Sequence, residues 1–164
     1  GRVLRCADTV GGGVVAAKVG RPSRRQFRNA EAEAEVLRAL ERFDADRCRR
    51  FCVRLLDAFE LEEASLCLVF EPLALSLRGL MQAPGSRRCD GLLMVDIQEV
   101  SRQLLQALSF LHAAGIAHMD VKCTNVMLRD GAYDLVPHPR EPGREVATPR
   151  TRPFEAVLID FGSA

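Results

Sequence analysis

The stretch HMDVKCTN at residues 118–125, followed further along by DFG at 160–162, decides how this sequence is interpreted. Asp120 stands five residues before Asn125. This is the spacing of a catalytic-loop pattern for phosphoryl transfer, in which the Asp accepts the proton of a substrate hydroxyl and the Asn holds a metal ion. Lys122 lies between them and can neutralise charge on a transferred phosphoryl group. The Asp that opens the second stretch supplies a further carboxylate for Mg²⁺. This order of side chains indicates phosphoryl transfer from ATP.

The bulk composition is that of an ordinary folded chain. It has 164 residues, 48% of them hydrophobic, which suffices for one core. The 23 Lys and Arg nearly balance the 22 Asp and Glu, so no overall field favours nucleic acid or a membrane, and no apolar stretch reaches the roughly 18 residues of a membrane span. Because the six cysteines are irregularly spaced, we expect reduced thiols and an intracellular protein.

The first half of the sequence has the pattern of strands around one helix. Residues 14–19 are a short apolar and β-branched run after three glycines, which predicts a strand leaving a turn. Apolar side chains recur at helical spacing from about Phe27 to Phe43. The apolar runs 53–59 and 66–70 are separated by a short acidic segment, which predicts an antiparallel strand pair.

The second half changes to helical periodicity. Residues 73–81 begin this pattern, and 84–88 have the composition of a surface turn. Residues 129–157 hold five of the eight prolines, which predicts an irregular, solvated insertion; strand character returns at 157–159. The longest helical pattern covers 94–112, and its expected apolar side consists of Val95, Ile97, Val100, Leu104, Leu105, Leu108 and Leu111.

Lys18 ends the run VAAK at 15–18, within the first predicted strand, and this run matches a motif whose Lys lies against the α- and β-phosphates of ATP. Glu33 is its candidate partner, because Val36 and Leu37 follow three and four residues later and helical geometry turns them into the core beside it. At about 100° per residue, Glu35 lies about 200° around the helix from Glu33. The alternative is that the whole acidic run is a solvated helix face. The downstream motifs favour the pairing with Lys18, for Glu33 alone.

Together these motifs resemble a eukaryotic protein kinase, in which a hinge segment receives adenine through backbone groups. The corresponding segment here begins at Phe70, which we expect to close the rear of the pocket. Pro72 has no N–H to offer, so the C=O of Glu71 and the N–H of Leu73 are the available groups. A buried strand that ends at a turn would explain the same residues. The position of the segment between the Lys and the catalytic Asp favours the hinge.

Within the kinases, the chain resembles the CMGC group and, inside it, the LAMMER (CDC-like) dual-specificity kinases. The interval between Lys18 and Glu33 is short, as in that family, and Met119 replaces the usual arginine between His and Asp. Residues 133–135 (YDL) lie inside a long insertion before the DFG stretch, which also resembles the family. The homeodomain-interacting kinases share the sequence DFGSA at 160–164 and are the alternative.

The resemblance implies an α+β, protein-kinase-like bilobal fold that is truncated in this chain. Residues 1–73 correspond to an N-lobe that lacks its first strand and most of its Gly-rich loop and that ends in the hinge. Residues 74–164 correspond to a partial C-lobe, through the catalytic loop and DFG, with an insertion at about 129–157. We expect the isolated chain to be inactive, because half of the platform that binds the protein substrate is missing.

The resemblance also implies roles for the site residues, with ATP and Mg²⁺ as cofactors. Asp120 and Lys122 are the expected catalytic residues, and Asn125 and Asp160 the expected metal ligands. The residues expected at the nucleotide are Ala16, Lys18, Glu33, Phe70, Glu71, Leu73 and Met127.

The expected activity is transfer of the γ-phosphoryl group of ATP to Ser or Thr of protein substrates, and to Tyr if the chain is a dual-specificity enzyme. Arg/Ser-rich splicing factors as partners, and the nucleus rather than the cytoplasm as location, are implied by the family alone. We expect no direct contact with nucleic acid or membrane. The alternative is a pseudokinase or scaffold that keeps the motifs without turnover.

Overall fold

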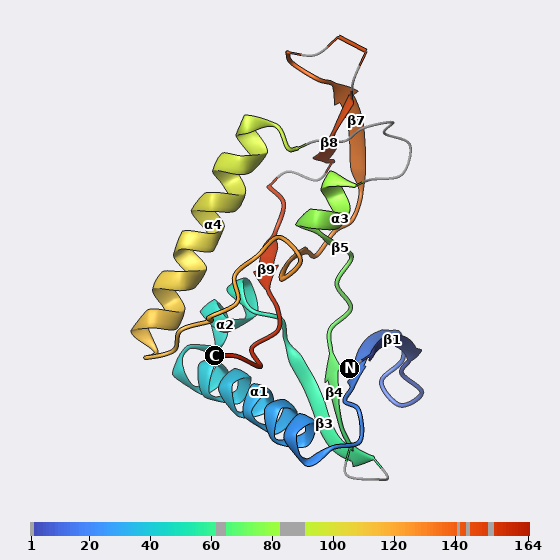
Figure 1. The fold of residues 1–164 in the computed structure, drawn as a ribbon, viewed down its shortest axis with the longest axis vertical. Coiled ribbons are helices and arrows are strands. Elements are labelled where there is room, and N and C mark those ends of the chain that lie inside the picture. Colours follow the sequence, from blue (N-terminus) through green and yellow to red (C-terminus); the bar gives the residue numbers. More distant parts are fainter. Residues whose placement is uncertain (1, 62–64, 83–90, 141, 144, 151–152) are drawn as a thin grey trace.

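The computed structural model describes residues 2–61, 65–82, 91–140, 142–143, 145–150 and 153–164. The predicted turn at 84–88 lies outside these residues. A four-stranded sheet and helix α1 occupy one end of the molecule, a two-stranded hairpin occupies the other, and helix α4 and a small sheet lie between them (Figure 1). This is the α+β arrangement that the sequence predicts.

The larger sheet has the strand order β1-β2-β4-β3, and all its neighbours are antiparallel. Its strands are β1 (Arg2–Ala7), β2 (Val14–Val19), β3 (Leu55–Leu61) and β4 (Ser65–Phe70). The strand predicted at 14–19 and the predicted antiparallel pair are therefore confirmed, although β3 begins two residues later than expected. Strand β2 lies between β1 and β4, so Lys18 near its end is held by pairing on both edges.

Helix α1 (Arg24–Phe43) confirms the predicted helix but begins three residues earlier. The earlier start has a local cause, because the side chain of Ser23 accepts a hydrogen bond from the N–H of Gln26 at 3.2 Å and caps the helix. Its buried residues are Glu33, Ala34, Leu37 and Leu40, so the expected core-facing side carries one carboxylate inward. Short helix α2 (Ala45–Phe51) follows at once.

The smaller sheet has the order β5-β6-β9, with strands β5 (Leu75–Ser76), β6 (Val126–Leu128) and β9 (Ala156–Leu158). The prediction of helical structure over the whole of 73–81 is wrong at its start, because residues 75 and 76 pair with β6. Helix α3 (Leu77–Met81) begins only after them.

Helix α4 (Met94–Ala113) confirms the longest predicted helix, but its predicted apolar side is partly wrong. Val95, Ile97 and Leu105 are exposed, whereas the polar side chains of Asp96 and Gln103 are buried. The cause is tertiary: the helix packs against β9 and α2, and Gln103 is turned towards the backbone ahead of β9. Among the residues that the structure describes, none of the helices combines the length and apolar character of a membrane span.

The prediction of irregular structure over 129–157 is wrong for residues 133–137 and 145–149, which form an antiparallel hairpin. Strand β7 (Tyr133–Pro137) pairs with β8 (Glu145–Pro149), and Val146 and Ala147 are buried. The prediction was wrong because it took the prolines as a sign of irregular structure. Pro137 ends β7 and Pro149 ends β8. In a two-stranded sheet each strand has a free edge, at which a missing N–H is tolerated.

One hydrophobic core joins the two ends of the molecule. Leu40 of α1, Leu68 of β4, Phe110 of α4 and Leu158 of β9 are all at most 1% exposed. Phe161 belongs to the same cluster. Both residues that flank the segment 159–160 are therefore anchored in the core, which fixes the position of the carboxylate carried there.

Candidate active site

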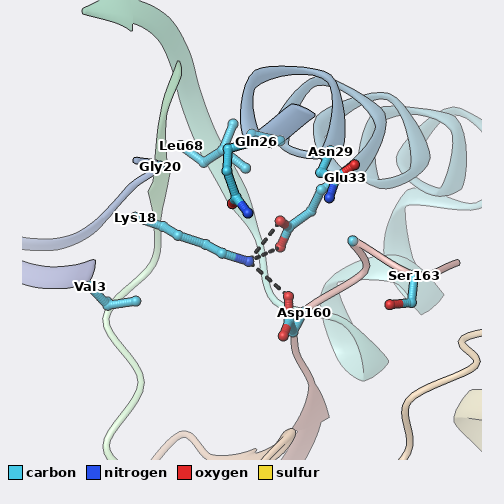
Figure 2. Close-up of a pocket in the computed structure, with 11 residues that line it drawn as sticks. Val3, Lys18, Gly20, Gln26, Asn29, Glu33, Leu68, Asp160 and Ser163 are labelled. Carbon is cyan, nitrogen blue, oxygen red and sulfur yellow. Dashed lines mark hydrogen bonds and ion pairs between the residues drawn. The ribbon is translucent and has the colours of Figure 1, made fainter. Parts of the chain in front are cut away.

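Three charged side chains from distant parts of the sequence meet at one point. Lys18 of β2 extends between Glu33 of α1 and Asp160, which follows β9 (Figure 2). Its Nζ lies 2.8 and 2.7 Å from Glu33 Oε1 and Oε2 and 2.8 Å from Asp160 Oδ1. The pairing of Lys18 with Glu33 that the helical pattern suggested is present, and the alternative of a solvated acidic face describes its neighbours Glu31 and Glu35, which are exposed.

Burial shapes the charges of this triad. Glu33 is 3% exposed, and this burial raises its pKa. The attraction and the hydrogen bond of Lys18 lower the pKa of Glu33, but burial is the larger cause and the net shift is upward. Burial also lowers the pKa of Lys18, but the attraction of Glu33 and the hydrogen bonds to both carboxylates outweigh it, so the net shift is upward. The Lys18 ammonium ion is therefore favoured and held in one place.

Lys18, Glu33 and Asp160 help to line a cavity of about 360 Å³, a volume within the range of small-molecule sites. All the residues predicted to bind the nucleotide line it, namely Ala16, Lys18, Glu33, Phe70, Glu71, Leu73 and Met127. Val3, Val53 and Ile159 also line it and were not predicted, because a single apolar residue in a strand pattern does not indicate which face it takes. A neighbouring cavity shares the triad and is lined in addition by Gln26, Asn29 and Ser163 (Figure 2).

The predicted hinge runs between two fixed points. Glu71 donates its backbone N–H to the carbonyl of Arg54 at 3.1 Å, and Ala74 donates to the carbonyl of Leu128 at 3.0 Å. Phe70 before the hinge is buried. Glu71, at the first anchor, and Leu73, between the two anchors, both border the cavity. The hinge residues with the backbone groups expected at adenine therefore lie beside it.

Asp120, Lys122 and Asn125 form a second cluster, outside the lining of this cavity. Lys122 Nζ lies 2.7 Å from Asp120 Oδ2. The side-chain amide of Asn125 donates to the same oxygen at 2.8 Å and to the Asp120 carbonyl at 3.0 Å. The hydrogen bond from Lys122 is the main cause that lowers the pKa of Asp120. Asp120 is thus an ionised, oriented acceptor at the protein surface.

His118 connects this cluster to the triad. It is 2% exposed; its Nε2 lies 3.0 Å from the Ile159 carbonyl, and its Nδ1 accepts the N–H of Asp120 at 3.3 Å. Its ring lies 4.9 Å from that of Phe161. These contacts agree with the predicted structural role of His118. Met119 beside it is 77% exposed and has a φ of 61°, so the turn directs its side chain away from the core.

Comparison with known proteins identifies the family. The family model described as protein kinase domain matches residues 1–164 of this sequence. The chain belongs to the protein kinase family.

Individual kinases are similar over much or all of the chain. The serine/threonine-protein kinase AFC1 of Arabidopsis thaliana is 31% identical over 99% of the chain, and the human dual specificity protein kinase CLK1 is 30% identical over 100%. These similarities confirm the predicted resemblance to the LAMMER (CDC-like) kinases. The DYRK-family kinase pom1 of Schizosaccharomyces pombe is 33% identical over 78% of the chain.

The chain corresponds to part of these relatives. It spans 35% of AFC1, 32% of CLK1 and 11% of pom1. The crystal structure of the PF14_0431 kinase domain superimposes with a TM-score of 0.78 at 28% identity, covering 98% of this chain and 46% of that one. The predicted truncated bilobal kinase fold is therefore confirmed.

The two clusters together suit a hard divalent cation bound with a nucleotide. Because the Asn125 amide nitrogen donates to two Asp120 oxygens, its amide oxygen is the atom that can serve as a ligand, and Asp160 adds a carboxylate. The backbone carbonyl of Asn125 accepts the backbone N–H of Ile159 at 3.0 Å. This bond holds the backbone of Asn125 beside the residue that precedes Asp160. Within the described residues no three acidic, His or Cys side chains form a metal site on their own. The side chains of Asn125 and Asp160 match in number the one or two protein ligands that Mg²⁺ takes together with phosphate oxygens and water.

Proposed function

We propose that this chain forms the ATP-binding and catalytic-loop region of a protein kinase that transfers the γ-phosphoryl group of ATP to Ser or Thr of protein substrates. The observation that carries the proposal is the bidentate contact of Lys18 with Glu33, in the lining of a cavity that the hinge residues Glu71 and Leu73 also line. A lysine held in this way presents a fixed positive charge to phosphates. Membership of the kinase family supports the same conclusion.

Each side chain has a defined task in this reaction. The hinge backbone at Glu71 and Leu73 orients adenine, and Lys18 orients the α- and β-phosphates. Asp120 accepts the proton of the substrate hydroxyl, while Lys122 stabilises charge on the transferred group.

Asn125 and Asp160 would hold Mg²⁺, which when bound neutralises charge on the β- and γ-phosphates. Asp160 is in contact with Lys18, so the same cation that meets the phosphates also positions a metal ligand.

The finer assignment is to a LAMMER-like kinase that also phosphorylates Tyr. The similarity to a dual specificity protein kinase supports it, as do the short interval between Lys18 and Glu33 and the presence of Met119. The homeodomain-interacting kinases are the alternative within the same group, and the sequence DFGSA at 160–164 supports them. Arg/Ser-rich substrates and a nuclear location are further proposals, which rest on the family resemblance.

Nucleotide binding and turnover are tested separately. Titration calorimetry with ATP and Mg²⁺ should show binding to the wild-type chain and a loss of about tenfold or more in Lys18→Ala, since that change removes a charge-assisted contact with phosphate. Arg150→Ala is the control, because Arg150 pairs with Asp134 in the hairpin. Failure of the wild-type chain to bind ATP would refute the proposal.

Phosphotransfer is then measured on the longer protein that contains these residues, using a peptide with Ser, Thr and Tyr acceptors. We expect Asp160→Ala and Asp120→Asn to abolish turnover. ATP binding without turnover by the wild-type protein would favour the scaffold alternative. Undiminished turnover in Asp160→Ala would contradict the metal role assigned to that residue.

A further inference from the structure

Arg129 joins segments that are far apart in the sequence. It follows strand β6, and its guanidinium group donates to the carboxylate of Glu71 in the hinge and to the backbone carbonyl of Arg49 near the end of α2. Its Nε lies 3.1 Å from Glu155 Oε2, and its backbone N–H donates to the Glu155 carbonyl at 3.1 Å. Arg129 therefore connects the hinge, helix α2 and the segment that leads into β9.

Glu71 is held from both sides. Its Oε1 accepts the backbone N–H of Arg54 at 2.9 Å, and its Oε2 accepts from Arg129. The Glu71 side chain is 20% exposed and that of Arg129 is 25% exposed. In such a partly desolvated place a charge-assisted hydrogen bond is stronger than at the surface. By contrast, the Glu155 side chain is 66% exposed, so its contact with Arg129 contributes less.

We propose that Arg129 is a positioning residue for adenine, which acts by fixing Glu71 and hence the hinge peptide that follows it. The inference rests on the proposed binding of ATP. Arg129 is not among the residues that line the cavity, so it acts through Glu71. A hinge already held in its binding conformation spares the nucleotide the cost of ordering it. Without Arg129, the Glu71 carboxylate keeps only its contact with the N–H of Arg54. The peptide group that follows Glu71 in the hinge can then adopt other orientations.

The position of the defect predicts a distinctive binding pattern. The hinge meets the adenine ring, whereas Lys18 meets the phosphates. Loss of Arg129 should therefore weaken the binding of adenosine and of ATP by the same factor. Loss of Lys18 should weaken the binding of ATP and leave the binding of adenosine unchanged. General damage to the fold would instead lower the melting temperature and reduce the fraction of chains that bind, with the affinity of the folded chains unchanged.

The test compares Arg129→Gln with Arg150→Gln by calorimetric titration of the full chain with adenosine and with ATP. Arg150 is the matched control, since it also makes an ion pair, with Asp134 at 2.7 Å, but lies in the hairpin. We expect Arg129→Gln to weaken both ligands by about tenfold, the size of one charge-assisted hydrogen bond, and Arg150→Gln to change neither. In a Glu71→Gln background the added effect of Arg129→Gln should shrink, because the two residues act as a pair.

Equal affinity of Arg129→Gln and wild type for adenosine would overturn the inference while leaving the proposed function intact. A loss confined to ATP would overturn it too, because it would place Arg129 at the phosphates. If Arg129→Gln does not fold, Arg129→Lys serves instead: it keeps one charge near Glu71 and should weaken both ligands by an intermediate factor, and no change in it would overturn the inference. Absence of adenosine and ATP binding in the wild-type chain would refute the proposed function itself.

Discussion

Replacing Gln103 by Leu should destabilise the chain, because this buried side chain ties helix α4 to the segment ahead of β9. Gln103 is 8% exposed. Its amide nitrogen donates to the Phe154 carbonyl at 2.8 Å and, within the helix, to Glu99 Oε1 at 2.6 Å, and its amide oxygen accepts the N–H of Ala156 at 2.9 Å. Leucine has similar bulk but can make none of these bonds. The substitution therefore removes the two hydrogen bonds to residues 154 and 156, together with the bond to Glu99, with little change in packing.

The expected cost follows from those two bonds. Ala156 is 5% exposed, and a buried N–H that loses its acceptor costs about 1–3 kcal/mol. The bond to Phe154 contributes a further ~0.5–1.5 kcal/mol. Additional apolar burial by Leu offsets about 1 kcal/mol. The net loss in the free energy of unfolding is about 0.5–3.5 kcal/mol, which lowers the melting temperature by roughly 1–14 °C for a chain of this size.

The assay is urea unfolding followed by circular dichroism, with Gln106→Leu as the matched control. Gln106 lies on the same helix, is exposed, and accepts a hydrogen bond from Arg102 at 3.0 Å. Its replacement should change the free energy of unfolding by no more than about 0.5 kcal/mol. Equal stabilities of the two variants, with unchanged dependence on urea concentration, would show that the anchoring of residues 154–156 by Gln103 is energetically unimportant and would refute the reasoning.

Two further predictions concern a helix cap and a titrating group. Ser23→Ala should lower the free energy of unfolding by about 1 kcal/mol, since α1 loses its capping bond to Gln26; in urea unfolding Ser23→Asp should keep the cap, and equal stability of the Ala and Asp variants would contradict this. The pKa of Asp120 is lowered below its ordinary 3.8, chiefly by the hydrogen bond from Lys122, so the stability it contributes is present above pH 3.8 and is lost as the pH falls through the folded-state pKa. The difference in free energy of unfolding between wild type and Asp120→Asn should therefore shrink from pH 7 to pH 3, and a difference independent of pH would rule out this contribution.

The cluster around Asp120 could be predicted because its residues are close together in the sequence. Asp120, Lys122 and Asn125 lie within one loop, so their spacing already brings them into contact. Glu33 could be predicted because a regular helix places residues three and four positions apart on nearby faces.

Other features depended on which element packs against which. Lys18 meets Glu33 and Asp160 across 15 and 142 residues of sequence, and the distance to Asp160 is set by the core that anchors β9. The hairpin at 133–149 was missed because the prediction counted prolines, whereas their positions at strand ends permit pairing. Arg129 gave no signal, since a lone arginine after a strand is ordinarily solvated.

The sequence by itself therefore determined the family and which side chains make up the candidate site, because the distances within a loop and the angles within a helix follow from local geometry. The tertiary structure decided how the site is assembled and supported. Periodicity shows that a helix has two faces, but the elements packed around α4 decided that Gln103 would be buried and Leu105 exposed. The enclosure of Glu33 and the attachment of the hinge to Arg129 were likewise decided by contacts between elements distant in the chain.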